Sequence, residues 1–403
     1  MQRESKEYID CINILNEELI PAMGCTEPIA VAYCAASARE LLGEIPDKVI
    51  VEASGNIIKN VKSVIVPNTG HLKGLQVAAA AGIIAGDASK KLQVISSVSK
   101  QQIEAIKDYT QKTDIEVKHF NSELIFDIQI TVYKDTQYAK CRIANHHTNI
   151  VLREKDGEVI EQSDINSTSS TKLTDREFLN CSVIYDFVES LDVEDIRDVI
   201  GRQIEFNMAI AAEGIQGNYG ANIGSTILKE NEALNKINDK AVVKQRAKAM
   251  AAAGSDARMN GCEMPVVINS GSGNQGITAV VPVMVFGEYL KTDEDKLYRA
   301  VTLSNLIAIY QKYPIGRLSA YCGAVNAGVG AGCGIAYLYG AGLDGIEHTL
   351  VNALAVASGV VCDGAKASCA AKIALAVENG IFGYEMWENG QEFMGGDGIV
   401  KKG

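Results

Sequence analysis

Alternating, β-branched segments occur in only one stretch of this chain, residues 46–165, and Ala- and Gly-rich segments with helical spacing lie on both sides of it. Alternation with a period of two is typical of strands, and apolar spacing of three and four is typical of helices. We therefore expect an α+β protein in which a mainly helical domain carries an inserted β-rich α/β domain. The expected bounds are 1–45 and 170–403 for the helical domain, 46–165 for the α/β domain and 165–174 for a linker.

The predicted strands are KVIVEA, VKSVIVP, LQVISSV, IEVKHF, LIFDIQITVY, YAKCRIA and NIVLRE, with one helix, QQIEAIKDY, among them. Asp156-Gly157, between NIVLRE and EVIEQ, is a hairpin turn signal. A capping-box pattern, Thr174-x-x-Glu177, predicts the start of a helix after the linker. Outside the β-rich stretch we expect helices near 5–20, 26–43, 193–213, 234–253, 276–290, 293–312, 318–343, 346–360 and 366–379.

Composition and charge exclude several classes of protein. The 403 residues carry a net charge of −12 and show no basic stripe, so nucleic acid and anionic membranes are not expected as partners. The N-terminal residues MQRESKEYID lack the apolar core of a secretion signal, and we expect a cytoplasmic protein. Residues 318–343 are uncharged, but seven of the 26 are Gly, which favours a buried, closely packed helix over a membrane span.

Cys25, in PAMGCTEPIA, lies just before a predicted helix. The partial positive charge and unpaired N–H groups of a helix N-terminus stabilise a thiolate, which would act as a base or a nucleophile. The alternative is a small apolar residue of the core, because free cysteines are often buried.

Four of the ten cysteines, Cys322, Cys333, Cys362 and Cys369, fall within 48 residues. In a reducing compartment such a cluster suggests a metal site or catalysis. Gly364 allows Cys362 to lie in a turn and Cys369 early in the next helix, with Cys322 supplied by a neighbouring helix. Three thiolates suit an iron–sulfur cluster with one open iron, or a zinc site with a fourth ligand elsewhere. The alternative is a set of core cysteines in a small-residue bundle.

The segment INSGSGNQGITA, residues 268–279, contains G-x-G-x-x-G, but no further strand completes the βαβ unit that a dinucleotide site requires. A Ser- and Gly-rich loop that enters a helix also suits a carboxylate. The same loop resembles the S-G-N-x-G loops of pyridoxal-phosphate eliminases, but the nearest candidate for the Schiff-base lysine that those enzymes need is Lys366, in an unsuitable setting. A plain turn is the remaining interpretation.

Five segments together resemble the L-cysteine desulfidases, which are related to the α-subunit of iron–sulfur L-serine dehydratases: GCTEPIAVA, SGNIIKNVKSVIVPNTG, NGCEMPVVINSGSGNQGITA, RLSAYCGAVNAGVGAGCG and CDGAKASCAAKIA. The resemblance implies a [4Fe–4S] cluster held by Cys322, Cys362 and Cys369, with Cys333 as a substitute ligand. It implies that Cys25 is the catalytic base. The loop that binds the substrate carboxylate would use Ser270, Ser272 and Asn274. The spacing from Cys362 to Cys369 is shorter than in the dehydratases.

The expected function is therefore β-elimination of L-cysteine to hydrogen sulfide, ammonia and pyruvate by the helical, catalytic domain. The first alternative is an iron–sulfur L-serine dehydratase. Lesser alternatives are a pyridoxal-phosphate eliminase and a non-catalytic amino-acid sensor with a structural zinc. The expected partner is a small amino-acid substrate, and a homodimer is the default assembly.

Overall fold

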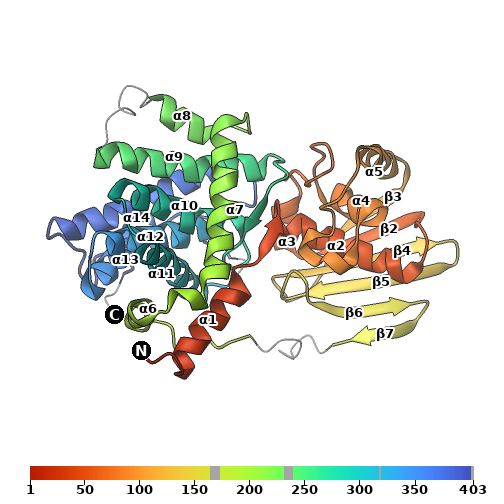
Figure 1. Ribbon diagram of the computed structural model, residues 1–403. Coiled ribbons are helices and arrows are strands. Elements are labelled where there is room, and N and C mark those ends of the chain that lie inside the picture. The colour runs from red at the N-terminus through yellow and green to blue at the C-terminus, as the bar shows by residue number, and fades with distance from the viewer. Residues whose placement is uncertain (164–172, 231–238, 317–318, 401–403) are drawn as a thin grey trace.

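The computed structural model describes residues 1–163, 173–230, 239–316 and 319–400. Figure 1 shows a sheet with its covering helices on one side of the molecule and a larger group of helices on the other. The chain starts in the helical part with α1 (Lys6–Glu18), enters the sheet part through α2 (Thr26–Leu42), and returns with α6 (Cys181–Ser190). The protein thus contains both a helical part and a mixed sheet, as an α+β protein should.

Six strands form the mixed sheet in the order β3-β2-β4-β5-β6-β7. β2 is parallel to β3, and the other neighbouring strands are antiparallel. Asp156 and Gly157, with φ of 49° and 87°, turn the chain from β6 into β7, so the predicted hairpin is confirmed. The strands are β2 (Lys48–Ala53), β3 (Asp114–His119), β4 (Asp127–Lys134), β5 (Gln137–Ala144), β6 (Ile150–Lys155) and β7 (Glu158–Gln162).

Helix α2 packs along β4 and β5, and α4 (Leu75–Ala85) packs against α2. The thiol of Cys34 in α2 donates a hydrogen bond to the carbonyl of Cys141 in β5, at 3.2 Å. The body of α2 therefore packs with the sheet, although its residues fall in the 1–45 segment that we assigned to the helical domain. Its first turn points the other way, toward the helical part.

Two of the predicted strands are wrong. VKSVIVP contains the end of α3 (Gly55–Val61) and a loop with one isolated bridge, between Ile65 and Lys73. The first two residues of LQVISSV are the last two of a 3₁₀ helix (Ala88–Gln93), and the next four residues form turns. Short apolar runs do not distinguish a strand from a buried loop or helix. The same ambiguity hid α4, whose run from Val77 to Ile83 is buried all round and so shows no amphipathic pattern. Helix α5 (Lys100–Lys112), in the same part of the molecule, was predicted.

The helical part contains most of the predicted helices, with shifted ends. Within the described residues, no helix is long and apolar enough to cross a membrane, and the predicted helix at 318–343 is the shorter α12. Most of the predicted linker at 165–174 lies outside the described residues. The helices are α7 (Arg197–Gln216), α8 (Ile223–Glu230), α9 (Lys240–Met259), α10 (Gly273–Leu290), α11 (Glu294–Lys312), α12 (Gly323–Leu338), α13 (Leu343–Ala357) and α14 (Cys369–Glu388). A short antiparallel pair, β1 (Pro21–Met23) with β8 (Pro265–Val267), joins the segment after α1 to the segment between α9 and α10.

Glycines let α12 and α14 meet backbone to backbone. A Cβ atom added at Gly380 would lie 2.0 Å from the carbonyl oxygen of Gly328, and one added at Gly332 would lie 2.2 Å from that of Gly380. No side chain fits at such distances, so the small residues fix how these two helices cross. The close packing expected from the Ala- and Gly-rich segments is therefore present.

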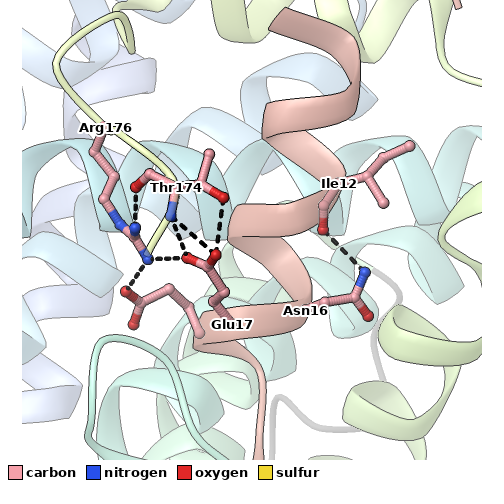
Figure 2. Close-up of polar contacts among 6 residues, drawn as sticks. Ile12, Asn16, Glu17, Thr174 and Arg176 are labelled. Carbon is pink, nitrogen blue, oxygen red and sulfur yellow. Dashed lines mark hydrogen bonds and ion pairs between the residues drawn. The ribbon is translucent and has the colours of Figure 1, made fainter. Parts of the chain in front are cut away.

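The predicted capping box at Thr174 is wrong, because α6 begins only at Cys181, with Asn180 as its cap. Figure 2 shows what Thr174 does instead: its N–H and hydroxyl donate to Glu17 Oε1 of α1, at 3.0 and 2.8 Å. The buried guanidinium of Arg176 pairs with Glu17 and Glu18, at 2.6 and 2.9 Å. The carboxylates of α1 thus accept the hydrogen bonds of Thr174 and Arg176, and this segment does not form the first turn of a helix.

Candidate active site

A cavity of about 100 Å³ lies where the first turns of α2, α10, α12 and α14 meet α3 and the last turns of α9 and α11. Its lining includes thiols, charged groups and amides, and it comes from segments that are far apart in the chain. The lining residues are Cys25, Glu27, Lys59, Asn60, Arg258, Ser272, Asn274, Gln275, Lys312, Ser319, Tyr321, Cys322, Gly323, Ala324, Cys362, Gly364, Ala365 and Cys369.

A short backbone pairing brings Cys322 and Cys362 together. Tyr321 and Val361 form an isolated antiparallel bridge. On either side of it, the N–H of Cys322 donates to the carbonyl of Val360 at 3.1 Å, and the N–H of Cys362 donates to the carbonyl of Ala320 at 2.7 Å. Two cysteines forty residues apart in the sequence therefore enter the cavity from adjacent extended segments.

Cys369 reaches the same cavity because the chain turns between Cys362 and the start of α14. Gly364 takes the left-handed conformation, φ 100°, and a Cβ there would lie 2.6 Å from the carbonyl oxygen of Lys59. Cys369 is the first residue of α14, and its sulfur lies 3.7 Å from the carbonyl oxygen of Gly364. This is the turn-then-helix arrangement that the spacing allowed.

The three thiols are close enough to influence one another. Burial raises the pKa of Cys369, and the neighbouring Cys322 and Cys362 raise it further. Burial likewise raises the pKa of Cys322. A bound cation would favour loss of the protons from Cys322 and Cys369, which is how thiolate ligands normally form.

Cys25 lies at the capping position of α2 and is 1% exposed. Its sulfur is 3.7 Å from the sulfur of Met259. Burial raises the pKa of Cys25 to about 12, and the positive charge of Arg258 opposes that shift. The expected position before a helix is present, but in this pocket burial outweighs the stabilisation of a thiolate that a helix N-terminus provides.

Part of the Ser- and Gly-rich loop lines the cavity, and part of it does not. Ser272, the capping residue of α10, and Asn274 line the cavity, and Arg258 Nη1 donates to Asn274 Oδ1 at 3.1 Å. Ser270 is not part of the lining, and its hydroxyl donates to Asn269 Oδ1 at 2.9 Å. The loop follows β8, whose one partner within the described ranges is β1, and those ranges form no βαβ unit around the loop.

Two residues raised as alternatives do not line the cavity. Cys333 is fully buried in the body of α12, with its sulfur 3.6 Å from the carbonyl of Ile346. Lys366 pairs with Asp363 at 3.3 Å. Cys333 is therefore not placed to substitute for a cavity thiol, and Lys366 is not placed as a Schiff-base lysine.

The surroundings of the thiols suit an anionic group. Lys59, Arg258 and Lys312 line the cavity, and four helices direct their N-terminal ends toward it. Lys312 is 3% exposed, burial lowers its pKa, and its Nζ lies 3.2 Å from Ser319 Oγ. Positive charge of this density stabilises thiolates and a carboxylate in the same space.

The donor set fits a cluster better than one ion. Among the described residues, no three His, Cys, Asp or Glu side chains are grouped closely enough to hold a single metal ion. In an iron–sulfur cluster each thiolate binds a different iron, so the sulfurs need not converge on one point. Three soft thiols on a positively charged cavity therefore fit such a cluster.

Sequence reasoning missed most of the polar lining. Glu27 and Gln275 lie within segments that we had singled out, GCTEPIAVA and INSGSGNQGITA, and only their neighbours were assigned roles. Asn60 and Lys59 lie on α3, which was not predicted. Arg258 and Lys312 lie near the last residues of long helices, where nothing in the sequence distinguishes them from surface cations.

The fold and this cavity define a protein with both a mixed sheet and a helical part whose helix starts surround a thiol-rich pocket. The sequence model of the serine dehydratase alpha chain matches residues 89–402, and the chain belongs to that family. The family is one of iron–sulfur serine dehydratases, and membership implies a lyase-type enzyme. The match includes Ser272, Cys322, Cys362 and Cys369 and stops short of Cys25.

Similar proteins cover the whole chain. A UPF0597 protein of Desulfitobacterium hafniense is 56% identical over 403 residues, which are all of this chain and 92% of that protein. A UPF0597 protein of Lachnoclostridium phytofermentans is 49% identical over 98% of this chain and 92% of its own length. A third, from Treponema denticola, is 44% identical over 100% of this chain and 93% of its own length.

Proposed function

We propose that this protein is an L-cysteine desulfidase, which converts L-cysteine and water into hydrogen sulfide, ammonia and pyruvate. The observation that carries the proposal is that one cavity is lined by Cys322, Cys362, Cys369, Cys25 and the first turn of α10. These are the groups that a lyase needs in order to hold a carboxylate, remove an α-proton and bind a leaving group. The resemblance of the five segments to the L-cysteine desulfidases supports sulfur as that leaving group.

Cys322, Cys362 and Cys369 would hold a [4Fe–4S] cluster. When bound, such a cluster with one iron free of protein ligands supplies a Lewis acid for the leaving group. Lys59, Lys312 and the helix N-termini around it would compensate its negative charge.

The substrate carboxylate would bind at the start of α10. Ser272 and Asn274 line the cavity there, and Ser270 would support the loop from behind. Unpaired N–H groups of a first turn favour an anion, and the guanidinium of Arg258 adds a full charge beside Asn274. The α-carbon of the substrate would then lie between this turn and the thiols.

Cys25 would remove the α-proton. Burial raises the pKa of Cys25 to about 12, so the side chain is a thiol at neutral pH. The thiolate that acts as the base would therefore have to form when the substrate binds, with the positive charge of Arg258 to stabilise it. Loss of the α-proton and of sulfide from the β-carbon gives aminoacrylate. This product tautomerises to the imine, and water hydrolyses the imine to pyruvate and ammonia.

Dehydration of L-serine is the second candidate, and the family match favours it. The same groups would hold L-serine, with its hydroxyl as the leaving group. The deciding experiment is anaerobic purification, followed by sulfide release from L-cysteine and pyruvate release from L-serine with the same preparation. A higher kcat/KM for L-serine would overturn the desulfidase assignment in favour of the dehydratase.

The base assignment is tested by Cys25→Ala. We expect the variant to keep its iron and acid-labile sulfide and to lose about 10²- to 10⁴-fold in kcat, the usual contribution of a general base. The matched control is Cys11→Ala, which removes another fully buried thiol, in α1, and should leave kcat unchanged. Full activity of the Cys25 variant would contradict the assignment.

We also propose that the helical part is the catalytic domain and that the sheet part is an inserted α/β domain. The cavity receives residues from α9, α10, α11, α12 and α14 of the helical part, and only the first turn of α2 and part of α3 come from the other side. On this proposal the sheet serves to position Cys25 and α3 against the thiols.

A further inference from the structure

We infer that Glu27, with Asn60 and Gln275, binds the α-ammonium group of the amino-acid substrate. The inference rests on the proposed function for its substrate class and extends it to the side of the cavity that has no assigned role. An amino acid enters such a site as a zwitterion, so a pocket that holds its carboxylate with cations must also satisfy a positive charge. Among the described residues that line the cavity, Glu27 alone has a carboxylate.

The contacts of Glu27 leave it free to accept more hydrogen bonds. Asn60 Nδ2 donates to its Oε1 at 3.0 Å, and the single hydroxyl proton of Thr26 is shared between its Oε2, at 3.1 Å, and the carbonyl oxygen of Gly271, at 3.0 Å. A carboxylate offers about four acceptor positions, so roughly two remain. Both donors are neutral, and within the described part of the chain no ion pair involves Glu27. Its charge is therefore available to a ligand.

Two further acceptors in the lining lack a donor. Asn60 Oδ1 and Gln275 Oε1 are buried and have no hydrogen-bond partner among the described residues. The side chains are 5% and 4% exposed, so solvent does not readily supply the missing donor. Buried acceptors are normally satisfied, and each exception requires an explanation. An ammonium group has three N–H donors and no acceptor, and it would satisfy this set.

The carboxylate and ammonium sites are adjacent, as one α-carbon requires. The hydroxyl of Thr26 lies 3.1 Å from Glu27 Oε2 and 3.0 Å from the carbonyl oxygen of Gly271, in the loop that leads to Ser272. One side chain therefore contacts both the proposed ammonium ligand and the proposed carboxylate loop. Cys25, the proposed base, precedes Thr26 and so lies beside both sites.

This arrangement makes the α-ammonium group a determinant of specificity. A substrate analogue without it would leave the Glu27 charge and two buried acceptors unpaired. Sites built to bind a polar group discriminate strongly against analogues that lack the group, for that reason. The enzyme should accept primary α-amino acids and reject the corresponding 2-hydroxy and 3-mercapto acids.

The test compares L-alanine with propionate by calorimetric titration of the anaerobically purified protein. Neither has a leaving group on its β-carbon, so neither reacts, and they differ in the ammonium group. We expect the native protein to bind L-alanine at least tenfold more tightly than propionate. Glu27→Gln should weaken L-alanine binding by about 10- to 100-fold, the cost of losing one partner of a desolvated charge pair, and leave propionate unchanged.

Two further variants keep the test decisive. Gln275→Met removes an acceptor without a change of charge and should weaken L-alanine severalfold, with propionate unchanged. Glu52→Gln is the matched control, because Glu52 bonds Gln129 on the sheet at 2.6 Å, outside the cavity lining, and its loss should change neither affinity. Thermal melting of each variant checks that the fold is retained.

Equal affinity of the native protein for L-alanine and propionate would overturn the inference. Glu27→Gln and Gln275→Met variants that bind L-alanine as tightly as the native protein would also overturn it. If Glu27→Gln binds L-alanine with native affinity but has lost turnover, Glu27 acts as a base and does not bind the ammonium group. Failure of the proposed function would be visible separately, as an absence of both sulfide release from L-cysteine and pyruvate release from L-serine in the native protein.

Discussion

None of the described helices that begin at the cavity has a side-chain cap on its first turn, whereas the helices that begin elsewhere are divided. Among the latter, α3, α4, α7 and α13 also lack such a cap. Five helices away from the cavity carry a Ser, Asn or Asp whose side chain accepts a backbone N–H of the first turn: Ser5 of α1, Ser99 of α5, Asn180 of α6, Asp239 of α9 and Asp293 of α11. At the cavity, the capping residues make no such bond: Cys25 of α2, Ser272 of α10, Cys322 of α12 and Ser368 of α14. A side-chain cap contributes about 1 kcal/mol, so these four helices lack that stabilisation where they meet the cavity.

The largest expected effect separates the start of one helix from its body. Cys322 and Cys333 both lie on α12, the first at the capping position beside the cavity and the second buried in the middle. We expect Cys322→Ala to lose its iron and all activity. Cys333→Ala should keep both and lose about 1 kcal/mol of stability through the small void that it leaves. Iron and acid-labile sulfide analysis after anaerobic purification measures the difference.

The reverse result, with iron retained in the Cys322 variant and lost in the Cys333 variant, would move the cluster away from the cavity. Equal iron in both would remove Cys322 from the proposed ligands.

The thiols of the site could be predicted from the sequence because cysteines are rare and their local setting is informative. Cys362 and Cys369 were placed in a turn and at a helix start by the single Gly364 between them. The positive and hydrogen-bonding lining could not be predicted in this way. Arg258 and Lys312 become part of the site only through the crossing of long helices, which depends on contacts between distant residues.

Some elements of the fold could likewise be predicted from the sequence, and others could not. The strands of the sheet that alternate clearly, such as β2 and β5, were placed correctly, as were the long helices with regular spacing. Fully apolar segments such as α4 were not, because burial on every side removes the periodicity that marks a helix. Thr174 failed for another reason: the partner of its hydroxyl is Glu17, 157 residues away, and local pattern cannot show it.

A second prediction concerns α8, whose first turn donates a hydrogen bond to a side chain of another helix, α9. Asp256 of α9 is buried, and its Oδ2 accepts the N–H of Gly224 in the first turn of α8, at 3.0 Å, while its Oδ1 has no hydrogen-bond partner among the described residues. Burial raises the pKa of Asp256 from 3.8 to about 6. The folded protein therefore binds a proton more tightly than the unfolded chain does. Stability from this group is present below about pH 4 and is lost as the pH rises through 6.

Asp256→Asn removes this titration and keeps an acceptor for Gly224. We expect the free energy of unfolding of the native protein, relative to the variant, to fall by about 2 kcal/mol between pH 4 and pH 7. Urea unfolding at several pH values measures the difference, in which the titration of all other groups cancels. A difference that stays constant over this range, or that grows with pH, would contradict the assignment.

The smallest expected effect compares two serines at helix starts directly. Ser99 caps α5 in a reciprocal pair, because its hydroxyl accepts the N–H of Gln102 at 3.3 Å and Gln102 Oε1 accepts the N–H of Ser99 at 2.9 Å. Ser99→Ala should lower the free energy of unfolding by about 1 kcal/mol and leave ligand binding unchanged. Ser272→Ala should change stability by less than about 0.5 kcal/mol, since its hydroxyl caps nothing, and should weaken propionate and L-alanine severalfold alike. If Ser272→Ala costs as much stability as Ser99→Ala and leaves both affinities intact, the first turn of α10 is an ordinary helix start, and the substrate carboxylate binds elsewhere in the cavity.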